Sequence, residues 1–432
     1  MPESQPQEPP EPDRDTAPGP TALLLSGARL TDGRTVDVRI GGGRIEAVGA
    51  AGSLSSPGPV PPWTTRVDLT GYLLLPAPAE PHAHYDTALT ADPDHAPSPH
   101  ASRGPDDPRR VQRRTAEAAL LQLGHGATAL RTHVRVGGAA GLDVLRAVLR
   151  ARRALRGLAD LTVVAVPGAL TGAAGADGRA VLRDAVELGV EAVGGRPDLD
   201  PDPAGHLETV LAVAAEYGRA VDLHVRGADP ARLSRFAALA GGLRTGVVVG
   251  PCDGLARLPY EIAARTAEAL AAAGITVVCL PQGGCGLLGR VRPTTPVRLL
   301  EAAGVRVAAG GGALRDTANP VGRGDPLEAA HLLVSRDEVR PEAAYEAVST
   351  RAREALGLPR VRIEPGFPAE LLAVRGGTLA GALSLAYSRL VVHRGRVVAR
   401  TSAVREYCDA VGAADAVDGH AAELGLPRQS QR

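Results

Sequence analysis

The chain of 432 residues contains no lysine, so arginine supplies all 48 of its basic side chains. Without lysine, the protein cannot form a Schiff base with a carbonyl substrate. It also cannot use a carboxylated lysine to bridge two metal ions. We therefore expect any metal centre in this chain to be mononuclear.

The sequence also lacks net charge and long apolar runs. Its 48 basic residues balance 48 acidic ones, and no stretch approaches the ~18 apolar residues of a membrane span. Residues 1–20 have neither the basic start nor the apolar core of a signal peptide and predict a disordered tail. The four cysteines show no C-x-x-C spacing and predict free thiols. We expect a cytoplasmic protein with no nucleic-acid or membrane partner.

Strand and helix patterns alternate through the middle of the chain. The expected strands are 73–76, 127–133, 161–166, 190–193, 220–225, 246–249, 275–280 and 305–309. Eight strands separated by helices predict a (β/α)8 barrel of the TIM type, and short β segments on both flanks predict one small shared β domain. The expected parts are a disordered tail (1–20), the β domain (21–72 and 363–403), the barrel (73–362) and a peripheral C-terminal tail (404–432).

A His-x-His pair follows the first expected barrel strand. His82 and His84 are two residues apart, and on a strand such residues point to the same side. Two imidazoles can therefore converge on one metal ion. This pair is the strongest chemical signal in the sequence.

Several segments resemble the amidohydrolase superfamily, and within it the cytosine deaminase branch. The resemblance covers residues 22–401 and rests on five segments. They are SGARLTDGR…DVRIGGGRIEAVG (26–49), LLLPAPAEPHAHYDTALT (73–90), RTHVRV (131–136), VDLHV (221–225) and SRLVVHRGRVVART (388–401). The resemblance implies one divalent metal, zinc or iron, with His82, His84 and His224 as ligands.

Other positions that the resemblance makes functional hold different residues. The histidine that closes strand six is absent from the segment around Pro251, and glycine stands at 312, where the metal-binding aspartate is expected. Gly227 replaces the general-acid glutamate, and Gly168 replaces the glutamine that reads a pyrimidine. His133 has no ligand role in the family, so we expect it to be a core or solvated residue.

Two hypotheses about function remain open. In the first, the chain is a degenerate amidohydrolase that binds metal weakly or not at all and has lost deaminase catalysis. It would then act by binding or regulation, as a homo-oligomer or with an active paralogue. In the second, it is an active hydrolase of C–N bonds in a cyclic amide or amidine, with a rewired three-histidine centre and Asp253 or Asp316 as the base. Both hypotheses allow a small-molecule ligand.

Overall fold

The computed structural model describes residues 22–54, 64–91, 107–138, 140–241, 243, 246–283, 293–336 and 338–403. The sequence-based expectations for the tails at 1–20 and 404–432 lie outside the described residues. None of the described helices is long and apolar enough to cross a bilayer.

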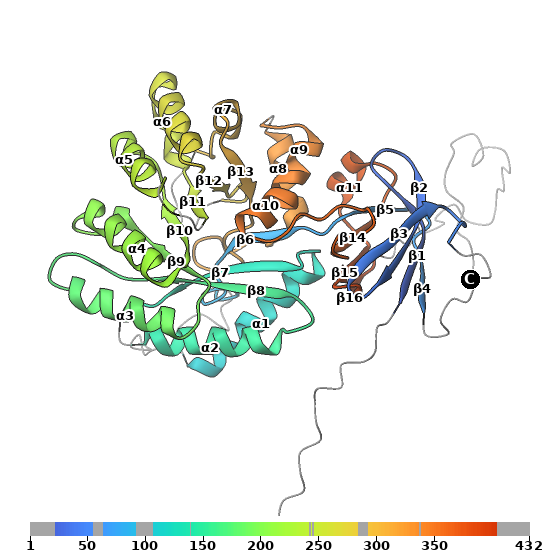
Figure 1. Cartoon of the computed structure of the whole chain (residues 1–432), viewed down its shortest axis with the longest axis horizontal. Coiled ribbons are helices and arrows are strands. Elements are labelled where there is room, and N and C mark those ends of the chain that lie inside the picture. Colours follow the sequence, from blue (N-terminus) through green and yellow to red (C-terminus); the bar gives the residue numbers. More distant parts are fainter. Residues whose placement is uncertain are drawn as a thin grey trace, which may run out of the picture. The chain divides into compact units, whose positions relative to one another are not determined.

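The central part of the chain forms a parallel barrel whose strands follow one another in sequence order (Figure 1). Its strands are β6 (Ala79–Ala83), β7 (Ala129–Arg135), β8 (Asp160–Val166), β9 (Ala192–Gly195), β10 (Ala220–Val225), β11 (Val247–Pro251), β12 (Thr276–Cys279) and β13 (Arg306–Ala309). A parallel bridge between Ala83 and Gly312 brings the last strand back to the first. The predicted (β/α)8 barrel is therefore confirmed.

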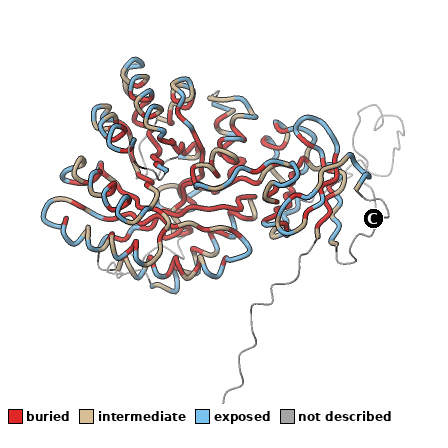
Figure 2. The backbone as a smooth tube through the Cα atoms, in the orientation of Figure 1, coloured by how far each residue is buried: buried red, intermediate tan, exposed pale blue. Residues whose placement is uncertain are grey.

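Helices follow the strands and cover the outside of the barrel. They are α1 (Pro108–Gly124), α2 (Gly141–Ala154), α3 (Gly175–Glu187), α4 (Pro203–Tyr217), α5 (Pro230–Ala240), α6 (Tyr260–Ala272), α7 (Val297–Ala302), α8 (Pro326–Ser335), α9 (Pro341–Val348) and α10 (Thr350–Ala355). The backbone is buried along the strands and alternates between buried and exposed around the helices (Figure 2). This burial pattern is that of amphipathic helices packed on an apolar sheet.

Four of these helices begin with the same dipeptide. Asp107, Asp202, Asp229 and Asp325 are the N-caps of α1, α4, α5 and α8, and a proline follows each of them. Each carboxylate accepts a backbone N–H of the first turn, and the proline occupies a position where no N–H is needed. Local chemistry thus fixes where each of these four helices starts.

Both flanks of the chain contribute to one mixed sheet, as predicted. Its strands are β1 (Leu23–Arg29), β2 (Thr35–Gly41), β3 (Arg44–Ala50), β4 (Thr65–Asp68), β5 (Tyr72–Pro76), β14 (Leu371–Arg375), β15 (Arg389–His393) and β16 (Arg396–Thr401), with α11 (Leu379–Leu385) between β14 and β15. The N-terminal and C-terminal strands meet where β5 pairs with β14 (Figure 1). Both sheets belong to one compact unit that ends at Thr401, and the domain division stays a prediction.

The first barrel strand differs from the expected one. The segment 73–76 lies in β5 and pairs antiparallel with β14, whereas the barrel begins at β6 (Ala79–Ala83). Pro76 and Pro78 interrupt the apolar run between the two strands, and proline cannot donate to a continuous ladder. The run is therefore divided between two sheets, and His82 lies within a barrel strand instead of after one.

Candidate metal centre

Four histidines from three barrel strands meet inside the barrel near the carboxyl ends of those strands. His82 lies in β6 and His84 follows it, His133 lies in β7, and His224 lies in β10. One ring nitrogen from each histidine lies within 4.8 Å of those of the other three. In barrels of this type the carboxyl end of the strands carries the active site.

The spacing of the rings suits a single ion. Nε2 of His84 and Nε2 of His224 lie 3.1 Å apart, and two nitrogens bound to one tetrahedral zinc at ~2.1 Å would be about 3.4 Å apart. The ring centroids of His82 and His133 are 4.1 Å apart, and those of His133 and His224 are 4.7 Å apart. His133 is thus as close to the other rings as they are to one another.

The imidazoles have the electrostatic state that metal ligands need. Burial lowers the pKa of His82, His84 and His224 well below 6.5, and the neighbouring His133 lowers it further. All three rings are therefore neutral at pH 7. Both ring nitrogens of His82 are buried with no hydrogen-bond partner among the described residues. Buried polar atoms are normally satisfied, so this arrangement points to a missing ligand.

A charged group lies two residues before three of these histidines on the same strands. On β7 and β10 these groups are Arg131 and Asp222, whose side chains form a buried ion pair of 2.9 Å. The other carboxylate oxygen of Asp222 lies 3.1 Å from Nε2 of His133. Burial raises the pKa of Asp222, but His133 and Arg131 outweigh it, and the net shift is downward. An ionised Asp222 therefore lies against the ring of His133, in the place from which second-shell carboxylates can orient ligand imidazoles.

On β6 the corresponding group is Glu80. Its carboxylate accepts the N–H of Gly311 at 2.7 Å and that of His82 at 3.0 Å. Burial raises its pKa to about 8 despite these donors. A Cβ at Gly310 would lie 2.4 Å from Oε1 of Glu80. The glycines after β13 therefore leave the space that this carboxyl group fills.

The comparisons with known proteins agree with this arrangement. A sequence model of the Amidohydrolase family matches residues 105–399. The chain belongs to the amidohydrolase family. The superfamily resemblance recognised in the sequence is thereby confirmed.

Three proteins with named activities are similar to this chain. The chain is 27% identical over 427 residues to a pterin deaminase of Rhizobium rhizogenes, which covers 89% of this chain and 93% of that protein. The crystal structure of N-isopropylammelide isopropylaminohydrolase from Burkholderia multivorans superposes with a TM-score of 0.76 at 29% identity, covering 89% of this chain and all of the other. The 5-methylcytosine deaminase of Klebsiella pneumoniae, at 21% identity and a TM-score of 0.74 over 89% of this chain, shows the same fold.

The expectation of a degraded site is not supported. His82, His84 and His224 come together as the resemblance implies, and His133 joins them although we expected only a core or solvated role for it. A fourth imidazole offsets the loss of the aspartate after strand eight, because zinc accepts nitrogen and oxygen ligands alike. The signal that the sequence did offer was a repeated pattern of one charged residue two positions before each strand histidine.

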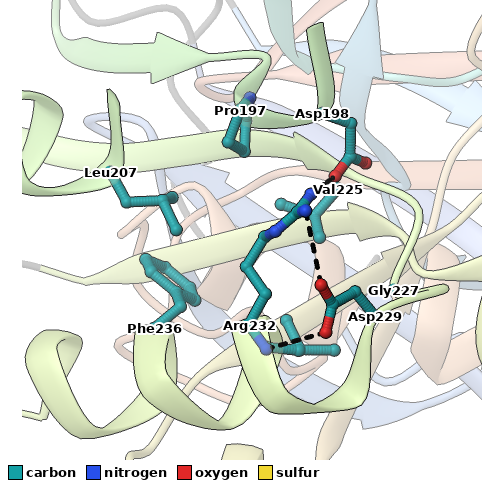
Figure 3. Close-up of a pocket in the computed structure, with 9 residues that line it drawn as sticks. Pro197, Asp198, Leu207, Val225, Gly227, Asp229, Arg232 and Phe236 are labelled. Carbon is teal, nitrogen blue, oxygen red and sulfur yellow. Dashed lines mark hydrogen bonds and ion pairs between the residues drawn. The ribbon is translucent and has the colours of Figure 1, made fainter. Parts of the chain in front are cut away.

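Gly227, which stands where the family resemblance places the general-acid glutamate, does not open a substrate pocket. Gly227 has a φ of +76°, and an added Cβ would lie 3.2 Å from Cγ of Leu255. The cavity beside it has a volume of only about 10 Å³, room for one water. Figure 3 shows that Arg232 lies across it, paired with Asp198 and Asp229. A glutamate cannot be restored at 227 without strain.

Asp316 and Asp253, the two candidate bases predicted from the sequence, both accept hydrogen bonds from neighbouring residues. Asp316 accepts the N–H groups of Ala318 and Asn319 and the hydroxyl of Thr87. Asp253 accepts from Arg226 at 2.7 Å. Their assignment as bases stays a prediction.

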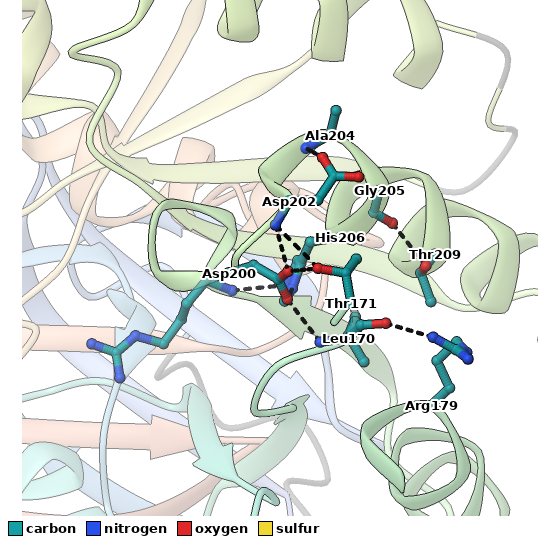
Figure 4. Close-up of polar contacts among 10 residues, drawn as sticks. Leu170, Thr171, Arg179, Asp200, Asp202, Ala204, Gly205, His206 and Thr209 are labelled. Atoms are coloured by element: carbon teal, nitrogen blue, oxygen red, sulfur yellow. Dashed lines mark hydrogen bonds and ion pairs between the residues drawn. The ribbon is translucent and has the colours of Figure 1, made fainter. Parts of the chain in front are cut away.

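A larger cavity of about 380 Å³ opens at the carboxyl ends of β7, β8 and β9. Asp200 joins the loops that form its wall (Figure 4). It accepts the N–H of Leu170 at 2.7 Å and the hydroxyl of Thr171, and it lies 2.8 Å from Nδ1 of His206. Burial raises the pKa of Asp200, but hydrogen bonds, with that of Thr171 the largest, lower it to about 2.

We expect Asp200→Asn to lower the free energy of unfolding by about 1–3 kcal/mol at pH 7, since an amide leaves buried donors unpaired. The pKa of Asp200 is depressed on folding, so its contribution is full above pH ~4 and is lost as the pH falls toward 2. Urea unfolding at pH 7 and pH 3 measures the difference, which should shrink at pH 3. Asp202→Asn is the control, because Asp202 is an N-cap and asparagine caps equally well. Equal losses in the two variants would contradict this role of Asp200.

Proposed function

We propose that this chain is an active metal-dependent hydrolase that cleaves a C–N bond in a cyclic amide or amidine, as deaminases do. The observation that carries the proposal is the cluster of four histidines with unpartnered buried nitrogens. Family membership supports it, as do the activities named for the pterin deaminase and the isopropylammelide hydrolase. The degenerate alternative loses its main support, because it assumed that the metal site is incomplete.

The donor set fits one divalent ion such as zinc. His82, His84, His133 and His224 would hold it, and neutral imidazole is a preferred zinc ligand. When bound, such an ion polarises a substrate carbonyl or amidine and lowers the pKa of water toward 7. Catalytic zinc usually has three protein ligands and one open position, so one of the four imidazoles would have to leave a position for substrate or water. His133 would differ from the other three in that its Nε2 also lies 3.1 Å from the carboxylate of Asp222.

Proton transfer requires a further group near the reacting atoms. Asp253 and Asp316 remain the candidate bases; Asp253 begins a short 3-10 helix after β11, and Asp316 lies in the loop after β13. A positioned acid or base contributes roughly 10²–10⁴ in rate. Asp316 is the candidate closer in sequence to the glycines that contact Glu80.

The test is turnover by the purified, zinc-loaded chain. We expect release of ammonia or amine from at least one of pterin, cytosine and N-isopropylammelide, and loss of that activity on chelation and its return with zinc. Asp316→Asn and Asp253→Asn should separate the two bases, because only the true base lowers kcat by roughly 10²–10⁴. Exposed Asp143 on α2 forms an ion pair with Arg146, and Asp143→Asn is the matched control. A zinc-loaded protein that hydrolyses none of the three compounds would support the degenerate reading.

A further inference from the structure

Two arginines line the cavity of about 380 Å³ at the carboxyl ends of β7, β8 and β9. Arg135 is the last residue of β7, two residues after His133. Arg196 directly follows β9, whose last residue, Gly195, pairs with the neighbour of His224 on β10. Both arginines therefore lie at the end of the barrel where the histidines converge.

The described residues that line the rest of this cavity include no amide side chain. Gly137 and Gly168 face each other there, and a Cβ added to Gly137 would lie 2.9 Å from the backbone nitrogen of Gly168. The close backbone approach excludes a side chain at 137. The glutamine that the family resemblance places at 168, which would read a neutral pyrimidine edge as both donor and acceptor, is thus replaced by bare backbone.

The acidic residue of the cavity is engaged by the loops that form the cavity wall. Asp200 directs its oxygens at Leu170, Thr171 and His206, which hold the two loops together (Figure 4). Arg135 contacts Asp86 only at 3.6 Å, and its side chain is 59% exposed. A ligand in the cavity can therefore reach the guanidinium of Arg135 without breaking a tight buried ion pair.

The position of Arg196 is fixed by the same network. Its backbone N–H donates to Nε2 of His206 at 3.2 Å, and Nδ1 of His206 lies 2.8 Å from the ionised Asp200. The ring of His206 is consequently neutral, with the proton on Nδ1. A recognition residue that extends from a fixed backbone loses less entropy when it binds a ligand.

A cavity lined by two cationic groups at the end of the barrel where the histidines converge concentrates anions.

We propose that Arg135 and Arg196 form a subsite for an anionic, oxygen-rich edge of the substrate. This inference rests on the proposed function and specifies its substrate class. A guanidinium group only donates hydrogen bonds, so its partner must only accept them. Such an edge is either a carboxylate attached to the heterocycle or the deprotonated imide of the ring itself, and a neutral amide edge does not satisfy it.

Binding of three product-like probes to the zinc-loaded full chain tests the subsite without requiring turnover. Uracil is neutral, orotate adds a carboxylate to the same ring, and barbiturate is a ring imide that is anionic at pH 7. We expect calorimetry to show that orotate or barbiturate binds roughly tenfold to a hundredfold more tightly than uracil, the range for charge-assisted hydrogen bonds. Tighter binding of orotate would identify a carboxylate as the edge that the subsite recognises. Tighter binding of barbiturate would identify the ring imide.

The variants Arg135→Gln and Arg196→Gln should each remove most of this preference and leave uracil affinity unchanged. Arg135→Lys should retain part of it, since lysine keeps the charge but lacks the fork of donors. Arg183→Gln is the control, because Arg183 lies on α3 and pairs with Glu216 outside the cavity.

Three outcomes would overturn the subsite: equal affinity for the three probes, no binding of either anion, or arginine variants that weaken all probes alike. Failure of the proposed function looks different. A protein that prefers anions through both arginines but hydrolyses no C–N bond would keep the subsite and lose the hydrolase assignment.

Discussion

Zinc affinity is expected to fall by more than about 100-fold when His133 is replaced by alanine. The ring of His133 lies as close to the other imidazoles as they lie to one another, so the change removes a ligand and not just a supporting group. Loss of an outer-shell partner typically costs 10–100-fold in metal affinity, and loss of a direct ligand should exceed this range. Competition with a chromogenic chelator measures the affinity, and the zinc-induced rise in Tm provides an independent readout.

Three variants show how the expected result can be contradicted. The double variant His82→Ala, His84→Ala should lose zinc binding altogether, whereas His331→Ala should leave it unchanged because His331 is exposed on α8. If His133→Ala binds zinc like the unmodified chain, the metal is held by His82, His84 and His224 alone. The rewired three-histidine centre implied by the sequence would then be correct. Circular dichroism checks that each variant is folded.

The second large effect concerns the contact between the mixed sheet and the barrel. Arg389 on β15 binds Asp325, the N-cap of α8, through two parallel contacts of 2.8 and 2.6 Å. Both side chains are only 5% exposed. We expect Arg389→Met to lower the free energy of unfolding by about 3–5 kcal/mol, because it leaves a buried carboxylate without its partner. Urea denaturation at pH 7 measures the change.

Two further variants separate the effect of burying the ion pair on stability from the effect of leaving one charge without a partner. Arg235→Met removes an exposed ion pair with Glu208 and should leave stability unchanged within error. The double variant Arg389→Met, Asp325→Asn should recover part of the loss, since asparagine keeps the N-cap and removes the stranded charge. A single Arg389→Met variant as stable as Arg235→Met would show that this ion pair does not hold the mixed sheet to the barrel.

Much of the fold could be predicted because it depends on local patterns. The alternation of apolar strands with amphipathic helices indicates the barrel, and the Asp-Pro caps mark where four of its helices begin. The error at 73–76 arose because one apolar run contains two strands, β5 and β6. Local hydrophobicity cannot show which sheet each strand joins, since that depends on the partner strands.

The sequence by itself also determined part of the site. His82 and His84 share one side of a strand through their spacing alone. The resemblance of the VDLHV segment to the family placed His224 with them, and the same resemblance indicated only losses at the glycines at 227 and 310–312.

Only the tertiary structure decided that the site is assembled from four imidazoles. His133 and Asp222 are 89 residues apart in number and come from β7 and β10, yet they lie 3.1 Å apart across the barrel. Glu80 likewise fills the space left by the glycine at 310. Barrel closure brings inward-facing side chains of distant strands together, and no local pattern in the sequence specifies which of them will meet.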